Sequence, residues 1–267
     1  MVSFPPCKIN LGLQILSRQP DGYHDIATCF YPLPWTDVLE VLPADTFVFE
    51  STGLQIPGAA EANLCVRAYQ LVHRDHKLSP VRIHLHKIIP TGAGLGGGSA
   101  DAAYMLRSLN AIFDLRLSEK ELSQYALQLG SDVSFFMQDD PKLGRGRGNA
   151  LETVGLNLKG FFIRLFKPEF SISTAEAYEK VVPGMPEKDI KHIVEGPCDL
   201  WKHELKNDFE PSLFKKHPLL QQIKTELYAS GAMYASMSGS GSSVFGLFEK
   251  EPAPFNYTLQ ACWSGHL

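Results

Sequence analysis

The order of the apolar patterns along the chain predicts an α+β protein. Apolar and polar residues alternate at 8–16 and at 81–89, as they do in half-buried strands. At 61–76 the apolar residues instead recur with the spacing of one helix face, and a second series of strands and helices begins at 161–168. Strands and helices mixed in this order are typical of α+β folds.

The first half of the chain follows the order strand, strand pair, helix, strand, glycine loop and two helices. The strand pair at 37–50 turns near Pro43, and the segment 90–110 is a glycine loop that runs into a helix of small residues. Ser118 and Glu121 form a capping-box pattern, which predicts a helix that ends at Gly130.

The second half begins after a stretch at 141–148 that is basic and predicted to be flexible. We place the domain boundary near residue 156, which gives an N-terminal domain of residues 1–156 and a C-terminal domain of residues 157–267. The later elements expected are a helix from Thr174, a linker rich in Pro and Gly at 183–197, a helix around 218–230, a strand–turn–strand about 236–243 and a last strand near 257–263.

Composition excludes several classes of protein. Of the 267 residues, 44% are hydrophobic, which is enough to fill a core and argues against disorder. A formal net charge of -4 argues against a nucleic-acid partner, because such affinity rests on basic surface. The five cysteines are scattered and odd in number, as in reduced proteins. With no signal-peptide core and no apolar run near the ~20 residues of a membrane span, we expect a cytoplasmic protein without a membrane partner.

The glycine loop is the strongest functional signal of the chain. Its glycines lie between a predicted strand and a predicted helix, at Gly92, Gly94, Gly96, Gly97 and Gly98. Glycine lets backbone N–H groups converge on a ligand, and the positive end of the following helix dipole favours an anion. The loop therefore predicts a phosphate site. It is not a Walker A loop, because no lysine follows the glycines.

A dinucleotide-binding loop is the formal alternative. Gly92, Gly94 and Gly97 satisfy G-x-G-x-x-G, and Asp114 lies about 20 residues further on. Asp114 follows a helix, however, instead of closing a second strand, and the loop lies in the middle of the chain. A dinucleotide-dependent oxidoreductase therefore stays as a distant alternative.

The loop sequence PTGAGLGGGSADAA, at 90–103, closely resembles the phosphate loop of the GHMP kinases, P-x-G-x-G-L-G-S-S-A-x. The resemblance implies that the loop wraps the phosphates of ATP and that Mg²⁺ lies near its final serine. The residues expected at ATP on this basis are Pro90, Gly92, Gly94, Leu95, Gly96, Gly97, Gly98 and Ser99. It also implies an N-terminal domain similar to domain 2 of ribosomal protein S5 and a ferredoxin-like C-terminal domain.

Two further motifs of the family are present in the family's order. PPCKINLGL at 5–13 is followed by PDGYHDI at 20–26, and SMSGSGSSVFG stands at 236–246. K-I-N-L combined with D-G-Y-H resembles the GHMP kinases that phosphorylate the 2-hydroxyl of 4-diphosphocytidyl-2-C-methyl-D-erythritol in the non-mevalonate route to isoprenoids. The resemblance implies two small-molecule partners, ATP and this cytidine diphosphate ester. Another GHMP kinase, such as homoserine kinase, and a catalytically silent nucleotide-binding protein are the alternatives.

Phosphoryl transfer to a hydroxyl needs alignment, charge neutralisation and a proton acceptor. Asp132 matches the general base of the family, although by itself it is typical of the N-cap of a short helix. Lys8 matches the lysine beside that base, where it keeps the carboxylate ionised. Mg²⁺ is expected to arrive with ATP, because neither a dedicated carboxylate ligand nor a metal site of the protein itself is evident.

Recognition of cytosine needs flat faces and hydrogen-bond partners at the edge of the base. We expect Tyr23 to stack on the base, His24 to bond its edge and Tyr178 to supply a second aromatic face. The full set expected at the acceptor is Asn10, Tyr23, His24, Tyr178, Ser238 and Gly239.

The nucleoside of ATP is expected against Asn63 and Leu64, whose EANL sequence resembles the D-N-L segment of the family with Ala62 in place of the aspartate. Lys87, at the end of the strand before the loop, matches a position near the nucleotide and is alternatively a strand-end charge. The expected oligomeric state is a monomer or a weak homodimer.

Overall fold

The computed structural model describes residues 1–254 and 259–267. The chain forms two compact units, each assembled from separate stretches of sequence. Unit 1 comprises Met1–Cys7, Leu33–Thr91 and Gly96–Asp139, and unit 2 comprises Lys8–Pro32, Gly92–Leu95 and Asp140–Leu267. The predicted boundary near residue 156 stays a prediction, because these units divide the chain at several points and not at one.

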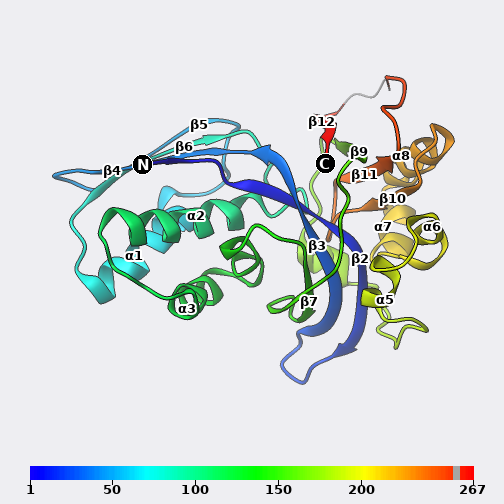
Figure 1. The fold of residues 1–267 in the computed structure, drawn as a ribbon, viewed down its shortest axis with the longest axis horizontal. Coiled ribbons are helices and arrows are strands. Elements are labelled where there is room, and N and C mark those ends of the chain that lie inside the picture. Colours follow the sequence, from blue (N-terminus) through cyan, green and yellow to red (C-terminus); the bar gives the residue numbers. More distant parts are fainter. Residues whose placement is uncertain (255–258) are drawn as a thin grey trace. The chain divides into compact units, whose positions relative to one another are not determined.

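Unit 1 is a mixed sheet with helices on one side. Its elements are β1 (Val2–Ser3), β4 (Val38–Pro43), β5 (Val48–Gly53), β6 (Val81–Lys87), α1 (Leu64–His76), α2 (Gly97–Ile112), α3 (Glu119–Leu129) and the 3-10 helices Ala60–Ala62, Ser131–Val133 and Phe135–Met137. The strand order is β1-β4-β6-β5, in which β5 and β6 are parallel and the other neighbours antiparallel. Figure 1 shows α1, α2 and α3 on one side of this sheet. The sheet is not the parallel one that a dinucleotide-binding fold requires.

The helices of unit 1 begin where the sequence supplies caps. α1 begins after Asn63, whose side-chain oxygen accepts the N–H of Cys65 at 2.9 Å. The predicted capping box of α3 is confirmed: Ser118 caps the N–H of Glu121, and the Glu121 carboxylate accepts the N–H of Ser118 at 2.9 Å. α2 follows the glycine loop and packs small residues against α1 and β4. Small side chains let α2 lie close to its neighbours, so the helix behind the loop is well anchored.

Strand β6 carries a lysine on its buried face. Val81, Ile83 and Leu85 are buried, and the same alternation places Lys87 on that face, where it is 2% exposed. A buried ammonium is unfavourable unless it is paired, so this position requires carboxylates nearby.

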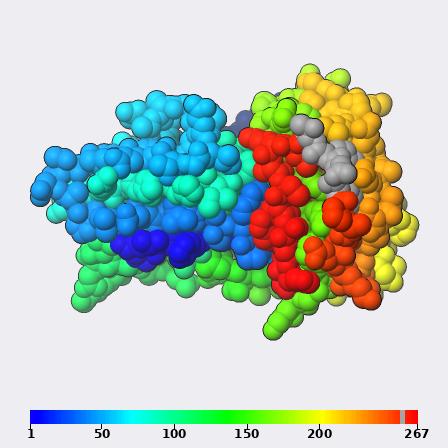
Figure 2. All heavy atoms as spheres, turned by 90° about the horizontal axis from the view of Figure 1, so that it is seen from above, coloured from blue at the N-terminus to red at the C-terminus, as the bar shows by residue number. Residues whose placement is uncertain are grey.

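Unit 2 contains two sheets and several short helices. The strands are β2 (Pro6–Arg18), β3 (His24–Thr36), β7 (Lys142–Gly146), β8 (Ala150–Thr153), β9 (Phe162–Lys167), β10 (Tyr234–Met237), β11 (Val244–Phe248) and β12 (Ala261–His266). The first two residues of β2 and the last four of β3 belong to unit 1. The helices are α4 (Thr174–Tyr178), α5 (Ile190–Val194), the 3-10 helix Cys198–Leu200, α6 (Trp201–Glu204), α7 (Glu210–Lys216) and α8 (Pro218–Ala229). The sheet orders are β2-β3-β7-β8 and β10-β11-β9-β12, and Figure 2 shows β12 in red along the surface. α8 packs on β10 and β11, and its Leu220, Ile223 and Leu227 join the core of the unit.

Predictions for the second half needed correction in three places. The stretch at 141–148, predicted to be flexible, contains strand β7, which pairs antiparallel with β3 and β8. Gly144 fits there because a Cβ would lie 2.5 Å from the ring of Phe30. The expected linker at 183–197 contains helix α5. The last strand, β12, lies later than the expected 257–263, and the first two residues of that range lie outside the described residues.

Candidate active site

The glycine loop leads into α2 through residues with a left-handed backbone. Gly92, Gly94 and Gly96 have φ angles of +61°, +75° and +70°, a region that side chains disfavour. Gly96 is the N-cap of α2, so the N–H groups of the first turn have no carbonyl partner inside the helix. The loop thus ends in backbone donors and in the positive end of a helix dipole, an arrangement that suits phosphate groups.

Segments from the start, the middle and the end of the sequence meet in unit 2 at the carbonyl of Gly94. Lys8 Nζ donates to Gly94 O at 3.0 Å and to Asn10 Oδ1 at 2.6 Å. The Ser238 hydroxyl donates to the same Gly94 O at 2.9 Å and accepts the N–H of Asn10 at 3.2 Å. Lys8 is 3% exposed, so it is a buried group and not a solvated charge. The structure therefore brings together residues from all three predicted motifs.

The serine–glycine loop between β10 and β11 approaches the glycine loop closely. A Cβ on Gly94 would lie 2.1 Å from Ser238 O, and a Cβ on Gly239 would lie 3.1 Å from Asn10 Oδ1. The side-chain amide of Asn207 donates to Gly239 O at 2.9 Å and fixes the serine–glycine loop from the other side. Gly94 must be glycine because the backbone of the serine–glycine loop lies where its side chain would be, and Gly239 combines a φ angle of +55° with little room beside the Asn10 side chain.

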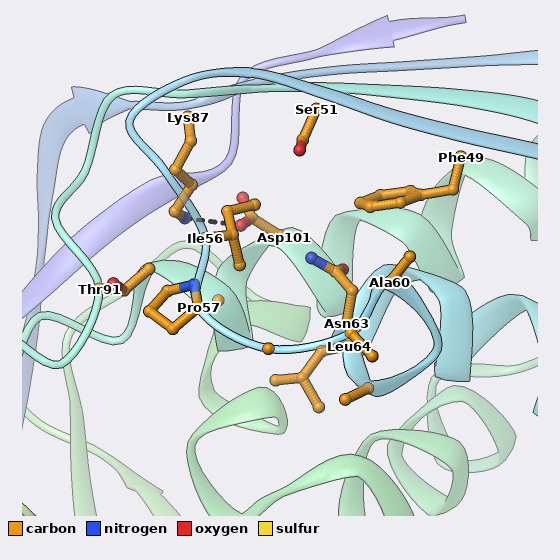
Figure 3. Close-up of a pocket in the computed structure, with 14 residues that line it drawn as sticks. Phe49, Ser51, Ile56, Pro57, Ala60, Asn63, Leu64, Lys87, Thr91 and Asp101 are labelled. Carbon is orange, nitrogen blue, oxygen red and sulfur yellow. Dashed lines mark hydrogen bonds and ion pairs between the residues drawn. The ribbon is translucent and has the colours of Figure 1, made fainter.

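Unit 1 contains a pocket of about 330 Å³ beside the starts of α1 and α2 (Figure 3). Its lining includes Phe49, Asn63, Leu64, Lys87, Gly98 and Asp101. The residues predicted for the nucleoside of ATP therefore lie together, with an aromatic ring from β5 added to them. Concave sites with apolar walls and a few polar groups are typical of small-ligand binding.

Lys87 is neutralised by two buried carboxylates that no motif indicated. Its Nζ lies 2.5 Å from Asp37 Oδ2 and 2.7 Å from Asp101 Oδ2, and all three side chains are at most 3% exposed. Burial raises the pKa of Asp101 to about 7, Lys87 opposes the rise and Asp37 adds to it. Burial lowers the pKa of Lys87, but the two carboxylates outweigh it and raise that pKa. Lys87 is therefore an internal ion-pair partner and not an exposed strand-end charge.

Asp132 lies in the short 3-10 helix that follows α3, within unit 1. The N-cap of this helix is Gly130, and no side chain of the described residues caps it, so the N-cap interpretation of Asp132 is wrong. Lys8 belongs to unit 2.

The aromatic residues predicted for cytosine have other partners in this structure. The rings of His24 and Tyr178 stack, with 4.6 Å between centroids and 21° between planes. Tyr23 is 58% exposed, and the guanidinium of Arg147 lies 3.9 Å over the centre of its ring. Arg147 also pairs with the carboxylate of Asp21 at the surface. Tyr178 thus lies against His24, while Tyr23 has one ring face covered by arginine.

Three supporting residues were missed by the sequence reasoning: Asp37, Asp101 and Asn207. Asp101 had a signal, because it stands alone among alanines in a helix of small residues, where a carboxylate needs a partner. Asp37 gave no signal in the sequence, because it lies 50 residues before the lysine that it binds. Asn207 likewise acts on a loop that is distant in sequence.

Residues 1–254 and 259–267 contain neither a metal-ligand cluster nor a membrane-spanning helix. In this part of the chain, no group of three His, Cys, Asp or Glu side chains is placed to hold a metal ion. Within the same ranges, no helix combines the length and apolar character needed to span a bilayer.

Two family models match the chain: GHMP kinases N terminal domain over residues 63–139, and GHMP kinases C terminal over residues 190–256. A Cytophaga hutchinsonii protein named 4-diphosphocytidyl-2-C-methyl-D-erythritol kinase is 48% identical over 266 residues, 98% of each chain. A crystal structure of 4-(cytidine 5'-diphospho)-2C-methyl-D-erythritol kinase is 34% identical, with a TM-score of 0.80 over 92% of this chain and 90% of that one. Mevalonate kinase of Methanococcus jannaschii, at 14% identity, is similar in fold alone, with a TM-score of 0.69 over 93% and 90% of the two chains.

Proposed function

Because this chain belongs to the GHMP kinase family and has its two-domain fold, we propose that it phosphorylates the 2-hydroxyl of 4-diphosphocytidyl-2-C-methyl-D-erythritol with ATP. This reaction is a step of the non-mevalonate pathway to isoprenoid precursors. The observation that carries the proposal is the match, over 98% of both chains, to a relative of that name. The contacts among Lys8, Asn10, Gly94 and Ser238 support it, since they join the K-I-N-L segment to the family's glycine loop and serine–glycine motif.

The glycine loop and the pocket of unit 1 are the proposed ATP site. The loop turns backbone N–H groups and the start of α2 toward the phosphates. The pocket takes the nucleoside, because its mixture of apolar and polar lining suits a purine and a ribose. The proposed ATP residues are Asn63, Leu64, Lys87, Pro90, Gly92, Gly94, Leu95, Gly96, Gly97, Gly98 and Ser99.

Mg²⁺ is proposed as the cation that accompanies ATP. The donor set fits an ion that is carried by phosphates, since the described residues offer no cage of three carboxylates, and Asp37 and Asp101 are bound to Lys87. Mg²⁺ commonly keeps several waters and takes its remaining ligands from phosphate oxygens. When bound, the ion neutralises charge on the phosphates.

Asp132 and Lys8 are the proposed catalytic residues. In the proposed reaction Asp132 accepts the proton of the 2-hydroxyl while the oxygen attacks phosphorus. Lys8 polarises the hydroxyl, and it is suited to this because Asn10 and Gly94 fix its ammonium group. A positioned general base contributes about 10²–10⁴ in rate, so positioning and charge neutralisation supply the remainder.

The cytidine diphosphate ester is proposed to bind along unit 2. Tyr23 offers the ring face that Arg147 does not cover, and His24 offers its edge to the base. Burial, and to a smaller extent Arg18, lower the pKa of His24, which favours the neutral imidazole that bonds a base edge. The other proposed contacts of the acceptor are Asn10, Tyr178, Ser238 and Gly239.

The proposed location is the cytoplasm, and the proposed oligomeric state is a monomer or a weak homodimer. All five cysteines are free thiols, which suits a reducing compartment. The proposed partners are these two small molecules, with neither nucleic acid nor membrane among them.

The test is ADP release by the purified protein with Mg·ATP and either the cytidine diphosphate substrate or homoserine. We expect turnover with the first acceptor alone. Asp132→Asn should reduce turnover by about 10²-fold or more while ATP still binds. Asp139→Asn is the matched control, because Asp139 is a surface carboxylate of the same unit, bound to Arg107. Turnover of homoserine alone would refute the proposed substrate. A fully active Asp132→Asn variant would refute the proposed role of Asp132 as the general base.

A further inference from the structure

Three buried ionisable groups of unit 1 lie beside the ends of the glycine loop and have no part in the proposed proton transfer. Asp37 lies between β3 and β4, Lys87 is the last residue of β6, and Asp101 lies in the second turn of α2. The ammonium of Lys87 joins the two carboxylates, as Figure 3 shows for the bond to Asp101. We call these three residues the ion triad.

The first end of the glycine loop is held by Asp37. Its Oδ1 atom accepts the N–H groups of Ile88 and Ile89, at 2.6 Å and 2.8 Å, while Oδ2 binds Lys87. One carboxylate therefore fixes three successive residues directly before Pro90, where the loop begins. Since both oxygens are used, the direction in which the chain enters the loop is set by this side chain.

The second end of the loop is held by Asp101. Asp101 Oδ2 binds Lys87, and its residue lies on the buried face of α2, four residues after the helix begins. The first residue of α2, Gly97, rests on the same group, because a Cβ there would lie 3.1 Å from Lys87 Nζ and 2.9 Å from Ile89 Cγ2. The first turn of α2 therefore packs directly against the ion triad.

The ion triad by itself is expected to contribute little to the free energy of folding. It buries two carboxylates against one ammonium, and the desolvation of buried charges commonly exceeds the attraction between them. Asp101 Oδ1 is in addition buried with no hydrogen-bond partner among the described residues. Apolar residues of similar volume would fill this space without those penalties. The arrangement is therefore better explained by what it positions.

We propose that Asp37, Lys87 and Asp101 are positioning residues that fix both ends of the glycine loop and so determine its affinity for the phosphates of ATP. This inference rests on the proposed function, because it takes the loop as the phosphate site. Asp37 is the cleanest probe, since Lys87 and Asp101 line the nucleoside pocket whereas Asp37 is not part of that lining. Changes at Asp37 therefore act on ATP indirectly, through the loop and through Lys87.

The experiment compares Asp37→Ala with Asp189→Ala as the matched control. Asp189 makes the same two kinds of bond in unit 2: its carboxylate lies 2.7 Å from Arg145 and accepts the N–H of Lys191 at 2.9 Å. For each variant, calorimetry gives the dissociation constant of Mg·ATP, and steady-state kinetics give kcat and KM for ATP and for the acceptor. Circular dichroism and urea unfolding report the folded fraction and the stability.

We expect Asp37→Ala to raise the dissociation constant and the KM for ATP roughly tenfold or more, because a shift of about 1 Å in a positioning group has effects of this size. KM for the acceptor should change less than about twofold. Asp37→Asn should restore most of the affinity, since its oxygen still accepts the two N–H groups. Asp189→Ala should lose stability and keep its affinity for ATP.

If Asp37→Ala does not fold, Asp101→Ala takes its place, with a rise in the dissociation constant of roughly fivefold or more expected. A folded alanine variant with the affinity of the unsubstituted protein would overturn the inference, as would an equal loss of affinity in Asp189→Ala. Failure of the unsubstituted protein to bind Mg·ATP would instead refute the proposed ATP site, and this inference with it.

Discussion

Replacing Gly94 with alanine tests how closely the glycine loop must approach the serine–glycine loop. Gly94 has a φ angle of +75°, and a Cβ there would lie 2.1 Å from Ser238 O. The carbonyl of Gly94 accepts hydrogen bonds from Lys8 Nζ and from the Ser238 hydroxyl. The substitution therefore strains the backbone, forces the loops apart and disturbs the group that aligns Lys8.

The magnitude follows from these contacts. A left-handed backbone costs about 1–2 kcal/mol for a residue with a Cβ, and overpacking a closed contact adds about 1–3 kcal/mol. We therefore expect Gly94→Ala to lower the free energy of unfolding by about 2–5 kcal/mol. At about 2–4 °C per kcal/mol for a chain of this size, the melting temperature should fall by at least about 4 °C.

Gly231→Ala is the matched control, because Gly231 has a φ angle of +92° and a Cβ there would meet nothing within 4 Å. It should show only the backbone cost of about 1–2 kcal/mol. The assay is urea unfolding of both variants and of the unsubstituted protein, with KM for ATP measured alongside. Equal losses of stability in the two variants, together with an unchanged KM for ATP in Gly94→Ala, would refute the reasoning.

Three further outcomes are expected. Lys8→Met should lower kcat about 10²-fold or more in the ADP-release assay, because the ammonium is lost while side-chain volume is kept. Chelation of Mg²⁺ should abolish ADP release without changing the melting temperature of the ATP-free protein, since the described residues hold no three-ligand metal cluster. Asp101 has a raised pKa, so the folded form keeps a proton between about pH 4 and pH 7 and the free energy of unfolding falls as pH rises through that window. Urea unfolding at several pH values should show that this fall is absent in Asp101→Asn.

Features that depend on neighbouring residues were predicted well from the sequence. The capping box of Ser118 and Glu121 formed as expected, because both halves of its chemistry lie within one helical turn. The glycine loop lies between β6 and α2 as predicted, since glycine spacing and helix onset are local signals. The period-two pattern of β6 also places Lys87 on the same buried face as Val81, Ile83 and Leu85, although its burial was not predicted.

Features that depend on distant residues were not predicted. Nothing near Asp37 indicates that it binds a lysine 50 residues later. The stretch at 141–148 looks flexible because glycine disfavours strands, yet pairing with β3 and packing against Phe30 outweigh that local preference. The stacking of His24 on Tyr178 likewise joins two residues that are far apart in the sequence, and no motif links them.

Many GHMP kinases have serine where this chain has Gly97 and Gly98. The ion triad predicts that serine is tolerated at only one of these two positions. A Cβ on Gly98 would lie 3.9 Å from Leu64 Cδ1, an ordinary contact, whereas one on Gly97 would press on Ile89 and Lys87 at 2.9 Å and 3.1 Å. We therefore expect Gly98→Ser to keep the KM for ATP within about twofold and Gly97→Ser to raise it roughly tenfold, because only Gly97→Ser displaces Lys87 from its carboxylates. Steady-state kinetics decide between them, and equal effects of the two serines would show that the triad does not control the loop.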